Sequence, residues 1–474
     1  MRVLSVVLLA AVTLAGAPSR APQTLAAAKL NVLFLVADDL NTGIGSYGAP
    51  VKTPNIDRLA GRGVRFDRAY CQYPLCSPSR SSFMTGRRPN ATGVLTNPGR
   101  NPLSPNFRER IPATVTLPQL FKQHGWFAAR IGKLFHYGVP LDIGTGSLDD
   151  YKSWDLAINP RGRDRDGLDR VFSLVPGQFG GTLSWLSDEG SDGEQTDGIG
   201  AAEAVRLLER FGKENRPFFL AVGFYRPHTP YVAPKKYFDL YPADAITLPT
   251  LSADDKARRP EAAYRSAKKE QDAMSDAQRR EATQAYYAST SFMDAQAGIV
   301  LDALERLGLS SRTVVVFTSD HGYHLADHGL WQKMSLFERS TRVPLIIAAP
   351  GAKAGGHVAR SPVELVDVYP TLAELAGLQA PEYLDGVSLR PMLDTPDHGV
   401  KDAAFSQVRD GYAVRTARWR YIEWAEGAKG AQLYDMEGDP DETANLAQDA
   451  RHAGTVAEMQ RLLQNYRGQA AEPR

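Results

Sequence analysis

The feature that most constrains the fold is a set of short, almost continuous apolar runs. The first is Asn31–Ala37, and similar runs occur at Phe218–Phe224, Thr313–Thr318 and Pro344–Ala348. A run without polar interruptions is typical of a strand buried on both faces of a sheet, whereas a half-exposed strand alternates apolar and polar residues. The runs therefore indicate a central sheet that is covered by helices on both sides.

Helical patterns lie between these runs. Around residues 293–307 the apolar side chains recur every three or four positions, and Gly308 stands where the C-terminus of a helix often needs a left-handed residue. A second helical pattern covers about residues 200–211. Strands that alternate with helices predict an α/β fold with a mostly parallel sheet.

The pattern changes near Thr395, and we expect a main domain at residues 29–395 and a small subdomain at residues 396–474. Four strand-like runs follow, at about residues 404–408, 412–416, 418–424 and 432–434. Turn residues such as Asp410-Gly411 separate them, which predicts an antiparallel meander. A helix is expected to close the chain at about residues 455–466.

The first 28 residues resemble a targeting segment. Arg2 precedes a mostly apolar run that ends at Leu14, and small residues then continue to Ala28. Because the run is shorter than the roughly 20 residues that span a bilayer, it favours a cleaved secretory signal peptide over a membrane anchor or a frayed apolar end. We expect an exported protein, periplasmic or secreted, without integral membrane association.

The charge balance and cysteine content exclude several classes of protein. Lys and Arg total 55 and Asp and Glu total 54, whereas a dedicated nucleic-acid binder usually has a clear basic surplus. No nucleic-acid partner is therefore expected. Cys71 and Cys76 are the two cysteines, too few for a disulfide scaffold. The charged stretch at residues 253–282 fits a solvated helical insertion or loop, with a rim that guides substrate as the alternative.

Several predicted strands are followed by residues that can bind metals or transfer protons. These residues are Asp38, Asp39, Lys133, His136, His228, Asp320 and His321. Since the carboxyl ends of parallel strands meet at one edge of a sheet, we expect these side chains to share a site. Carboxylates brought together repel unless a cation neutralises them, and their hard oxygen atoms suit Ca²⁺ or Mg²⁺. The sequence therefore predicts a divalent metal site.

Three histidines near this site leave another interpretation open. His321, His324 and His328 could bind zinc, but Gly322 and Gly329 interrupt the segment, so the histidines need not share a helix face. A hydrogen-bonded loop histidine is the simpler interpretation of His324.

Cys76 begins the segment Cys-Ser-Pro-Ser-Arg, residues 76–80, at a predicted helix start. A thiol at a helix N-terminus can ionise readily and act as a nucleophile, and a buried structural cysteine is the alternative. Neither interpretation explains the residues that follow it. The segment resembles the motif of type I sulfatases, in which a dedicated maturation enzyme oxidises this cysteine to formylglycine.

Other segments also resemble sulfatase motifs, in the family's order, and together they cover about residues 30–445. They are Asp38-Asp39, Thr85-Gly86-Arg87, Gly132-Lys133, Arg226–Pro230, Thr318–Gly322, Trp331–Lys333 and Leu433–Pro440. Within the family, Gly132–His136, Phe218–Gly223 and Tyr287–Asp294 are similar to the iduronate-2-sulfatase branch. The resemblance implies an alkaline-phosphatase-like α/β/α sandwich with a small antiparallel C-terminal sheet.

The resemblance also implies a role for each matched residue. Cys76, as hydrated formylglycine, would attack sulfur, expel the sugar alcohol and then release sulfate. The metal ligands would be Asp38, Asp39, Cys76, Asp320 and His321, with Ca²⁺ as the expected ion and Mg²⁺ as the alternative. The other catalytic residues would be Arg80, which orients the formylglycine, His136, which deprotonates it, and Lys133, His228 and Lys333, which contact the sulfate. His228 would also protonate the leaving oxygen.

The substrate implied by the resemblance is a sulfated saccharide, most closely the 2-O-sulfated iduronate or uronate of a glycosaminoglycan-like polysaccharide. The alternatives are another carbohydrate sulfatase, a phosphonate or phosphate ester hydrolase of the same superfamily, and a non-catalytic protein that binds sulfated glycans. Tyr323 replaces a Trp of the iduronate branch and His324 follows it, so we expect both to lie beside the sugar and to change its recognition.

Overall fold

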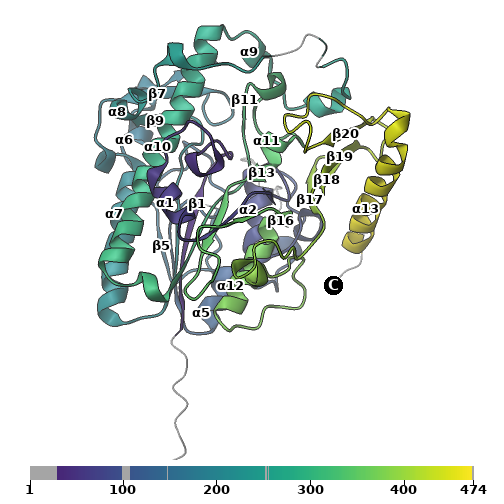
Figure 1. Ribbon diagram of the computed structural model, residues 1–474. Helices are drawn as coiled ribbons and strands as arrows, with labels where there is room; N and C mark the ends of the chain where they lie inside the picture. Colours follow the sequence, from purple (N-terminus) through teal and green to yellow (C-terminus); the bar gives the residue numbers. More distant parts are fainter. Residues whose placement is uncertain (1–28, 99–106, 147, 251–253, 255, 472–474) are drawn as a thin grey trace, which may run out of the picture.

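The computed structural model describes residues 29–98, 107–146, 148–250, 254 and 256–471 (Figure 1). The expected signal peptide, residues 1–28, lies outside the described residues. Across those described ranges, none of the helices combines the length and the apolar character that crossing a membrane requires.

A mostly parallel sheet of eight strands forms the centre of the molecule, as the sequence predicts. In spatial order the strands are β15 (Val358–Ala359), β2 (Val64–Phe66), β14 (Leu345–Ala348), β10 (Thr313–Ser319), β1 (Asn31–Ala37), β8 (Phe218–Gly223), β4 (Phe127–Gly132) and β5 (Leu156–Ile158). β1 lies in the middle and pairs in parallel with both β10 and β8. All four expected runs are therefore neighbours in this sheet, and three of them, β10, β1 and β8, are parallel.

The fourth expected run, β14, differs from the others in direction. It is antiparallel to β10, with Val315 opposite Ala348. A parallel pair needs a crossover connection that returns the chain to the end of the sheet where the first strand began. Residues 320–344 make no such crossover and remain near the carboxyl end of β10, so the chain re-enters the sheet in the opposite direction.

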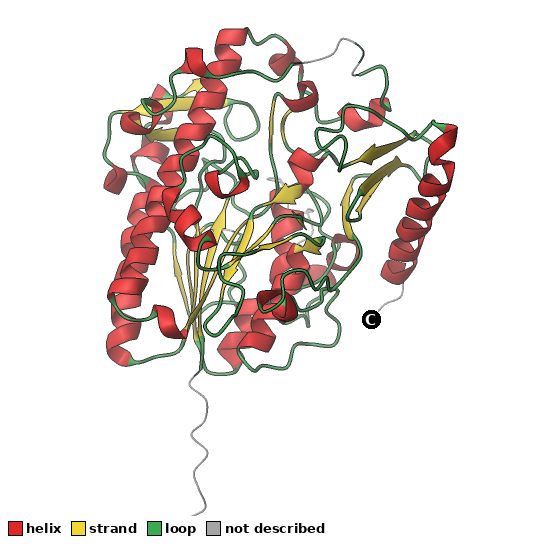
Figure 2. Ribbon diagram, viewed as in Figure 1, coloured by secondary structure: helices red, strands yellow, loops and turns green. Residues whose placement is uncertain are grey.

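Helices cover both faces of the sheet (Figures 1 and 2). Leu33 and Leu35 of β1 point into a core shared with α7 (Thr196–Glu214) and α10 (Asp276–Arg306). Phe34 and Val36 point to the other face, which is covered by α2 (Cys76–Thr85), α5 (Leu117–Gln123) and α12 (Val368–Leu375). Because successive side chains alternate between the two faces and both faces are buried, the strand is apolar throughout.

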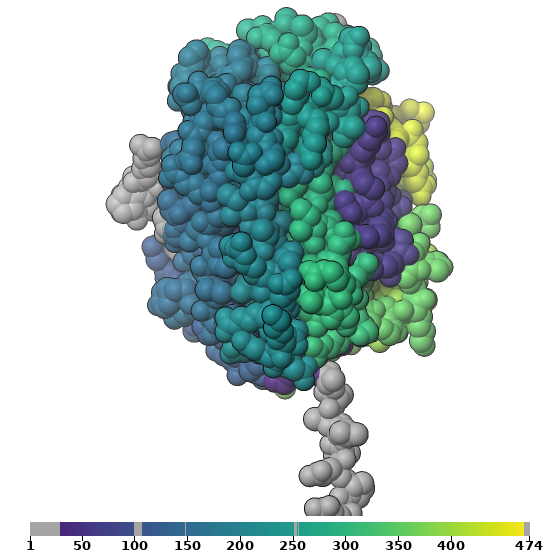
Figure 3. Space-filling model, turned by 90° about the vertical axis from the view of Figure 1, so that its left-hand side faces the viewer, coloured from purple at the N-terminus to yellow at the C-terminus, as the bar shows by residue number. Residues whose placement is uncertain are grey.

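The long helix α10 also anchors a short N-terminal helix, α1 (Pro54–Ala60). Asp294 of α10 accepts hydrogen bonds from the backbone N–H groups of Asn55 (3.2 Å) and Ile56 (2.8 Å). On the face shown in Figure 3, the purple residues of the N-terminal region lie beside a green band from the middle of the chain. α10 ends before Gly308, whose φ of +69° confirms the expected left-handed position.

A separate antiparallel sheet follows residue 403 and confirms the predicted meander. Its strands are β17 (Ala404–Val408), β18 (Gly411–Arg415), β19 (Trp419–Trp424) and β20 (Ala431–Asp435). The last helix, α13 (Ala453–Ala471), packs on one face of this sheet through Met459 and Leu463 (Figure 1). The domain boundary between residues 395 and 396 stays a prediction.

One turn of this meander differs from the expectation. Val408 pairs with Gly411, so the turn consists of Arg409 and Asp410, and Gly411 belongs to β18. A Cβ atom on Gly411 would lie 2.5 Å from the Trp424 ring. Glycine is needed at this position because the Trp424 ring packs against the strand.

The remaining elements are short. The strands are β3 (Ala69–Tyr70), β6 (Phe172–Ser173), β7 (Ser184–Asp188), β9 (Tyr231–Pro234), β11 (His324–Leu325), β12 (Trp331–Gln332), β13 (Arg342–Val343) and β16 (Val363–Glu364). The helices are α3 (Pro89–Thr92), α4 (Phe107–Arg110), α6 (Arg163–Asp166), α8 (Lys235–Phe238), α9 (Lys269–Asp272) and α11 (Glu338–Thr341). The described part of residues 253–282 contains α9 and the beginning of α10, in keeping with the expected helical insertion.

Candidate active site

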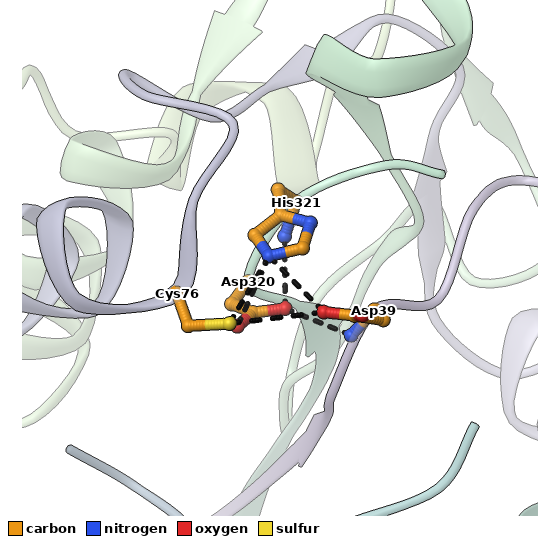
Figure 4. Close-up of side chains that lie close together, drawn as sticks. All are labelled: Asp39, Cys76, Asp320 and His321. Carbon is orange, nitrogen blue, oxygen red and sulfur yellow. Dashed lines mark hydrogen bonds and ion pairs between the residues drawn. The ribbon is translucent and has the colours of Figure 1, made fainter. Parts of the chain in front are cut away.

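Four of the expected site residues form one buried group beyond the carboxyl ends of β1 and β10. Asp39, Cys76, Asp320 and His321 offer ligand atoms that all lie within 4.8 Å of one another. Their side chains point toward a common centre (Figure 4). Nε2 of His321 lies 3.2 Å from Oδ1 of Asp39 and 3.4 Å from Sγ of Cys76. The predicted convergence of strand ends therefore occurs.

The helix α2 places both ends of the Cys-Ser-Pro-Ser-Arg segment in this site. Cys76 is its first residue, and Arg80 follows one turn later on the same face. Arg80 donates from Nε to Asp320 (2.9 Å) and from Nη2 to Asp38 (3.1 Å). The Ser79 hydroxyl donates to the backbone carbonyl of Asp320. The residues after Cys76 thus tie α2 to β1 and β10, which explains why they accompany the cysteine.

Asp38 is directed toward cations rather than into the four-residue group. Nζ of Lys133 lies 2.5 Å from one of its carboxylate oxygens, and Arg80 binds the other. Burial raises the pKa of Asp38 to about 6, although Lys133 opposes the shift. Its role as a metal ligand stays a prediction.

Asp39 has a strained backbone and one carboxylate oxygen without a hydrogen-bond partner in the described part of the chain. Its backbone has a φ of +64°, and Oδ1 accepts a hydrogen bond of 2.5 Å from Nζ of Lys333. Oδ2 is buried and has no hydrogen-bond partner within the described residues. A buried carboxylate oxygen without a partner is costly and calls for an ion or a donor at that position. The site residues therefore fit a divalent cation.

His321 is oriented to present one nitrogen to the group. Its Nδ1 lies 2.9 Å from the carbonyl oxygen of Gly322, a position that suits donation of the Nδ1 proton. Nε2 then faces the group with its lone pair, as in a metal-ligating histidine. Burial alone would lower the pKa of His321, but Asp320 and Asp39 raise it to about 9. The carboxylates thus favour a positive charge at this place.

Positive groups surround Cys76. Nζ of Lys333 lies 3.1 Å from Sγ, and the side chain of Cys76 is fully buried. Burial alone would raise the pKa of the thiol, but Lys133, Lys333 and His321 together hold it well below its usual value. The site therefore stabilises an anion at the end of residue 76.

Two further histidines face the same centre. Burial lowers the pKa of His136 to about 4, with a hydrogen bond to Cys76 opposing the shift and Lys133 adding to it. His136 is therefore neutral near pH 7 and can accept a proton. Nδ1 of His228 lies 2.6 Å from the carbonyl of Thr229, and its Nε2 lies 3.7 Å from Oδ2 of Asp39. His228 thus presents Nε2 to the site.

Tyr323 and His324 lie behind the site rather than on its surface. Both side chains are 0% exposed. The Tyr323 hydroxyl lies 2.6 Å from that of Tyr231, and Nε2 of His324 lies 2.7 Å from the Ser335 hydroxyl. The simpler interpretation of His324 as a hydrogen-bonded histidine therefore fits. Direct contact of these two side chains with a sugar stays a prediction, which their burial does not favour.

The three-histidine zinc site does not form within the described part of the chain. His321 alone of the three joins the buried group. The ring of His328 instead stacks on Phe337, with centroids 4.2 Å apart. His324 contacts the Ser335 hydroxyl and is not part of the group.

Sequence reasoning missed a residue that supports the group from behind. The Tyr286 hydroxyl donates to the carbonyl of Asp39 (2.8 Å) and accepts from the backbone N–H of Asn41 (2.9 Å). A tyrosine on the buried face of a helix is read as core, so no sequence signal singles it out. Sequence reasoning also missed Arg409 and gave no individual role to Lys268. Both line a pocket that Lys333 and His228 also line.

Comparisons with known proteins agree with this geometry. Residues 30–378 match the sulfatase family model, and residues 326–469 match the model for the C-terminal region of N-sulphoglucosamine sulphohydrolase. A sulfatase of Formosa agariphila is 36% identical over 450 residues, which cover 92% of this chain and 86% of that protein. Human iduronate 2-sulfatase is 34% identical in an alignment that covers 89% of this chain and 92% of that enzyme.

Solved structures confirm the alkaline-phosphatase-like fold. The phosphonate monoester hydrolase of Agrobacterium radiobacter superposes with a TM-score of 0.76 at 24% identity, covering 93% of this chain and 96% of that one. A 2-O GAG sulfatase superposes with a TM-score of 0.73 at 26% identity, covering 94% and 93% of the two chains.

Proposed function

The chain belongs to the sulfatase family, and from this premise we propose that it removes sulfate from a 2-O-sulfated iduronate or related uronate of a glycosaminoglycan-like polysaccharide. The observation that carries the proposal is the buried group of Asp39, Cys76, Asp320 and His321. Lys333 adds a cation beside Cys76. The similarity to human iduronate 2-sulfatase and to a 2-O GAG sulfatase supports the 2-O position.

Two groups would complete this site. A divalent cation, Ca²⁺ or Mg²⁺, held by Asp39, Asp320 and His321, would offset the charge of the sulfate oxygens. Residue 76, oxidised to formylglycine by a maturation enzyme, would supply a hydrated aldehyde in which one hydroxyl displaces the sugar alcohol from sulfur and the other lets sulfate leave without attack by water. All other steps fall to the side chains already in place.

The cations bind and orient the sulfate. Lys133 and Lys333 flank residue 76, and an ammonium group suits a non-planar anion such as a sulfate ester. Asp38 holds Lys133, Asp39 holds Lys333, and Arg80 holds both Asp38 and Asp320. These contacts place positive charge where the sulfate oxygens gain negative charge.

Two histidines would move the protons. His228 would give a proton from Nε2 to the leaving sugar oxygen, since that nitrogen faces the site. His136 would accept a proton from residue 76, because its lowered pKa keeps it neutral. Separate residues thus serve the two halves of the reaction.

The test is an assay of the full chain produced together with a formylglycine-generating enzyme. Peptide mass spectrometry reports the state of residue 76, and sulfate release is measured on 2-O-sulfated uronates, sulfated hexosamines and a phosphonate monoester. We expect the aldehyde at residue 76 and preferred turnover of the uronates.

Three other results would contradict parts of the proposal. Active protein that carries only the thiol would overturn the nucleophile. Preference for the phosphonate ester would favour the phosphorus-ester alternative. Undetectable turnover by protein with verified formylglycine would favour a non-catalytic protein that binds sulfated glycans.

We also propose that the protein is exported to the periplasm or secreted. The support is the apolar run and the small residues of positions 1–28. N-terminal sequencing of protein recovered outside the cytoplasm should begin at Lys29. An intact N-terminus on protein confined to the cytoplasm would contradict export.

A further inference from the structure

A pocket of about 310 Å³ opens onto Lys333 and His228 and carries more positive charge than one sulfate ester requires. Its lining also contains Arg265, Lys268 and Arg409, and no Asp or Glu is among the described residues that line it. A sulfate monoester has one negative charge, and Lys133 and Lys333 already flank its expected position. The outer cations therefore need a separate explanation.

Arg265 is already paired with a carboxylate, that of Asp410, which also pairs with Lys429. Its Nη1 lies 2.5 Å from Oδ1 of Asp410, and its guanidinium lies over the Trp424 ring. This arginine helps to hold the segment of residues 261–272 against the β17–β18 turn. It does not account for the charge that faces the pocket.

Lys268 has only uncharged partners. Its Nζ donates to the carbonyl of Gly181 and to Oε1 of Gln332 (2.6 Å), and it makes no ion pair with a carboxylate in the described part of the chain. Burial lowers the pKa of its ammonium group, and nearby Lys333 adds to this effect, against Glu270. A half-buried ammonium without a counterion is costly unless an anion joins it.

Arg409 approaches the pocket from the other side. It occupies the two-residue turn between β17 and β18 with a φ of +54°, and its backbone N–H donates to the Tyr73 hydroxyl (3.0 Å). Its Nη1 donates to the carbonyl of Arg265 (3.2 Å), and among the described residues its guanidinium forms no ion pair. The turn thus holds an exposed, uncompensated guanidinium at the rim.

The geometry points to a second anion subsite, in which Lys268 and Arg409 bind a carboxylate or a second sulfate of the saccharide beside the sulfate that is cleaved. This inference rests on the proposed function and names residues that would select the substrate. The two cations come from the insertion before α10 and from the C-terminal sheet, so both parts would take part in substrate selection. Sugars with one sulfate and no further anion would be poor ligands.

The test measures binding to the full chain carrying Cys76→Ala, which separates affinity from turnover. Two matched pairs of ligands are compared by calorimetry: a 2-O-sulfated uronate with its methyl ester, and an N,6-O-disulfated glucosamine with its N-acetyl 6-O-sulfated counterpart. We expect the more anionic member of one pair to bind about tenfold more tightly, because it gains charge-assisted hydrogen bonds. The pair that shows the preference identifies a carboxylate or a sulfate as the second anion.

Variants then assign the preference to residues. Lys268→Gln and Arg409→Gln, each on the Cys76→Ala background, should bring the affinity ratio of that pair close to one. Lys213→Gln removes an equal charge from the exposed end of α7, outside the pocket lining, and should leave the ratio unchanged. An unchanged melting temperature shows that the variants are folded, and the exposed Arg409 carries the test if Lys268→Gln is not.

The outcomes separate this inference from the proposed function. Equal binding of both members of both pairs, or a ratio that survives the two substitutions combined, overturns the subsite. If the formylglycine-loaded enzyme then still releases sulfate, the proposed function stands alone. A ratio that depends on Lys268 and Arg409 without any sulfate release supports the subsite and contradicts the enzyme. Absence of binding by all four ligands overturns the subsite, and it contradicts the proposed function as well only if the formylglycine-loaded enzyme also releases no sulfate.

Discussion

Two of the buried clusters of ion pairs in this protein differ in whether a reactive or metal-binding group lies among the charges. The active-site cluster joins Asp38, Asp39 and Asp320 to Arg80, Lys133 and Lys333. The second cluster joins Glu338 and Glu442 to Arg342, Arg415 and Arg420, at the contact between the main sheet region and the C-terminal sheet. Both are largely removed from solvent.

We call the second cluster closed because its charged groups pair with one another and none belongs to a group of possible metal ligands among the described residues. Even so, Oε1 of Glu442 and the Nε atoms of Arg415 and Arg420 make no hydrogen bond there. Oε1 of Glu338 accepts from the Tyr70 hydroxyl (2.9 Å), and Oε2 accepts from Arg420. The backbone N–H of Glu338 donates to Glu442 (2.8 Å). The active-site cluster, which we call open, also contains a carboxylate oxygen of Asp39 without a hydrogen-bond partner among the described residues. Here, however, the charges surround the Cys76 thiol and a group of possible metal ligands. Ion pairs that enclose no reactive or metal-binding group hold two parts of the chain together, whereas the ion pairs of the active site hold such groups in place.

The largest effect should come from the reactive residue of the open cluster. Cys76→Ala in protein produced with the maturation enzyme should lower sulfate release by about 10³-fold or more, since no other residue would replace the nucleophile. Cys71→Ala is the matched control, because Cys71 is equally buried and its pKa is raised by burial. Substantial turnover by Cys76→Ala would show that another group attacks sulfur.

The closed cluster should matter for stability rather than for chemistry. Glu338→Gln removes one charge from a buried network and should lower the free energy of unfolding by about 3–5 kcal/mol. Glu305→Gln, which breaks exposed ion pairs to Arg58 and Arg62, should cost less than about 1 kcal/mol. Chemical denaturation measures both, and equal losses would erase the distinction between buried and surface pairs.

The unmatched carboxylate of the open cluster should control metal binding. Asp39→Asn should weaken the binding of Ca²⁺ or Mg²⁺ by about 100-fold, because it removes a negative ligand from the site. Asp302→Asn, an exposed position on α10, is the control. Metal content after dialysis and the rise in melting temperature on adding metal provide the readout. Unchanged occupancy in Asp39→Asn would remove this residue from the ligand set.

A smaller effect on the same cluster is expected from its support. Tyr286→Phe deletes the hydroxyl that bridges the Asp39 carbonyl and the Asn41 N–H. It should weaken metal binding by about tenfold, a small loss for a residue that contacts a metal ligand rather than the metal. Tyr287→Phe, the next residue on α10, is the matched control. If both variants bind metal equally, the bridge does not position Asp39.

The closed cluster should also make the free energy of unfolding depend on pH. Burial alone would raise the pKa of Glu338, but Arg420, Arg415 and Arg342 hold it at about 2, below its ordinary value of 4.5. The unfolded chain therefore binds the proton first, and this contribution to stability is full above about pH 4.5 and is lost as the pH falls toward 2. The difference in unfolding free energy between the wild type and Glu338→Gln should shrink as the pH falls from about 4.5 toward 2. A constant difference would contradict the assigned charge.

Much of the fold could be predicted because the burial of a strand determines which residues its short sequence contains. β1, β8 and β10 are apolar throughout since both of their faces are covered, and the residues after them converge for the same topological reason. The direction of β14 could not be predicted, because it depends on whether residues 320–344 cross the sheet. The turn at Arg409-Asp410 was misplaced by one residue because Gly411 is required by the Trp424 ring rather than by the turn.

Local sequence is enough to predict the α/β class, the C-terminal meander and the motif-bearing residues of the candidate site, because strand burial and the Cys-Ser-Pro-Ser-Arg segment are properties of neighbouring residues. The three-dimensional fold is needed to show that Asp38 faces Lys133 and Arg80, that Tyr286 supports Asp39, and that Lys268 and Arg409 line one pocket. These contacts join residues that are tens to hundreds of positions apart. Their energies depend on distance and burial in space, and local sequence patterns contain neither quantity.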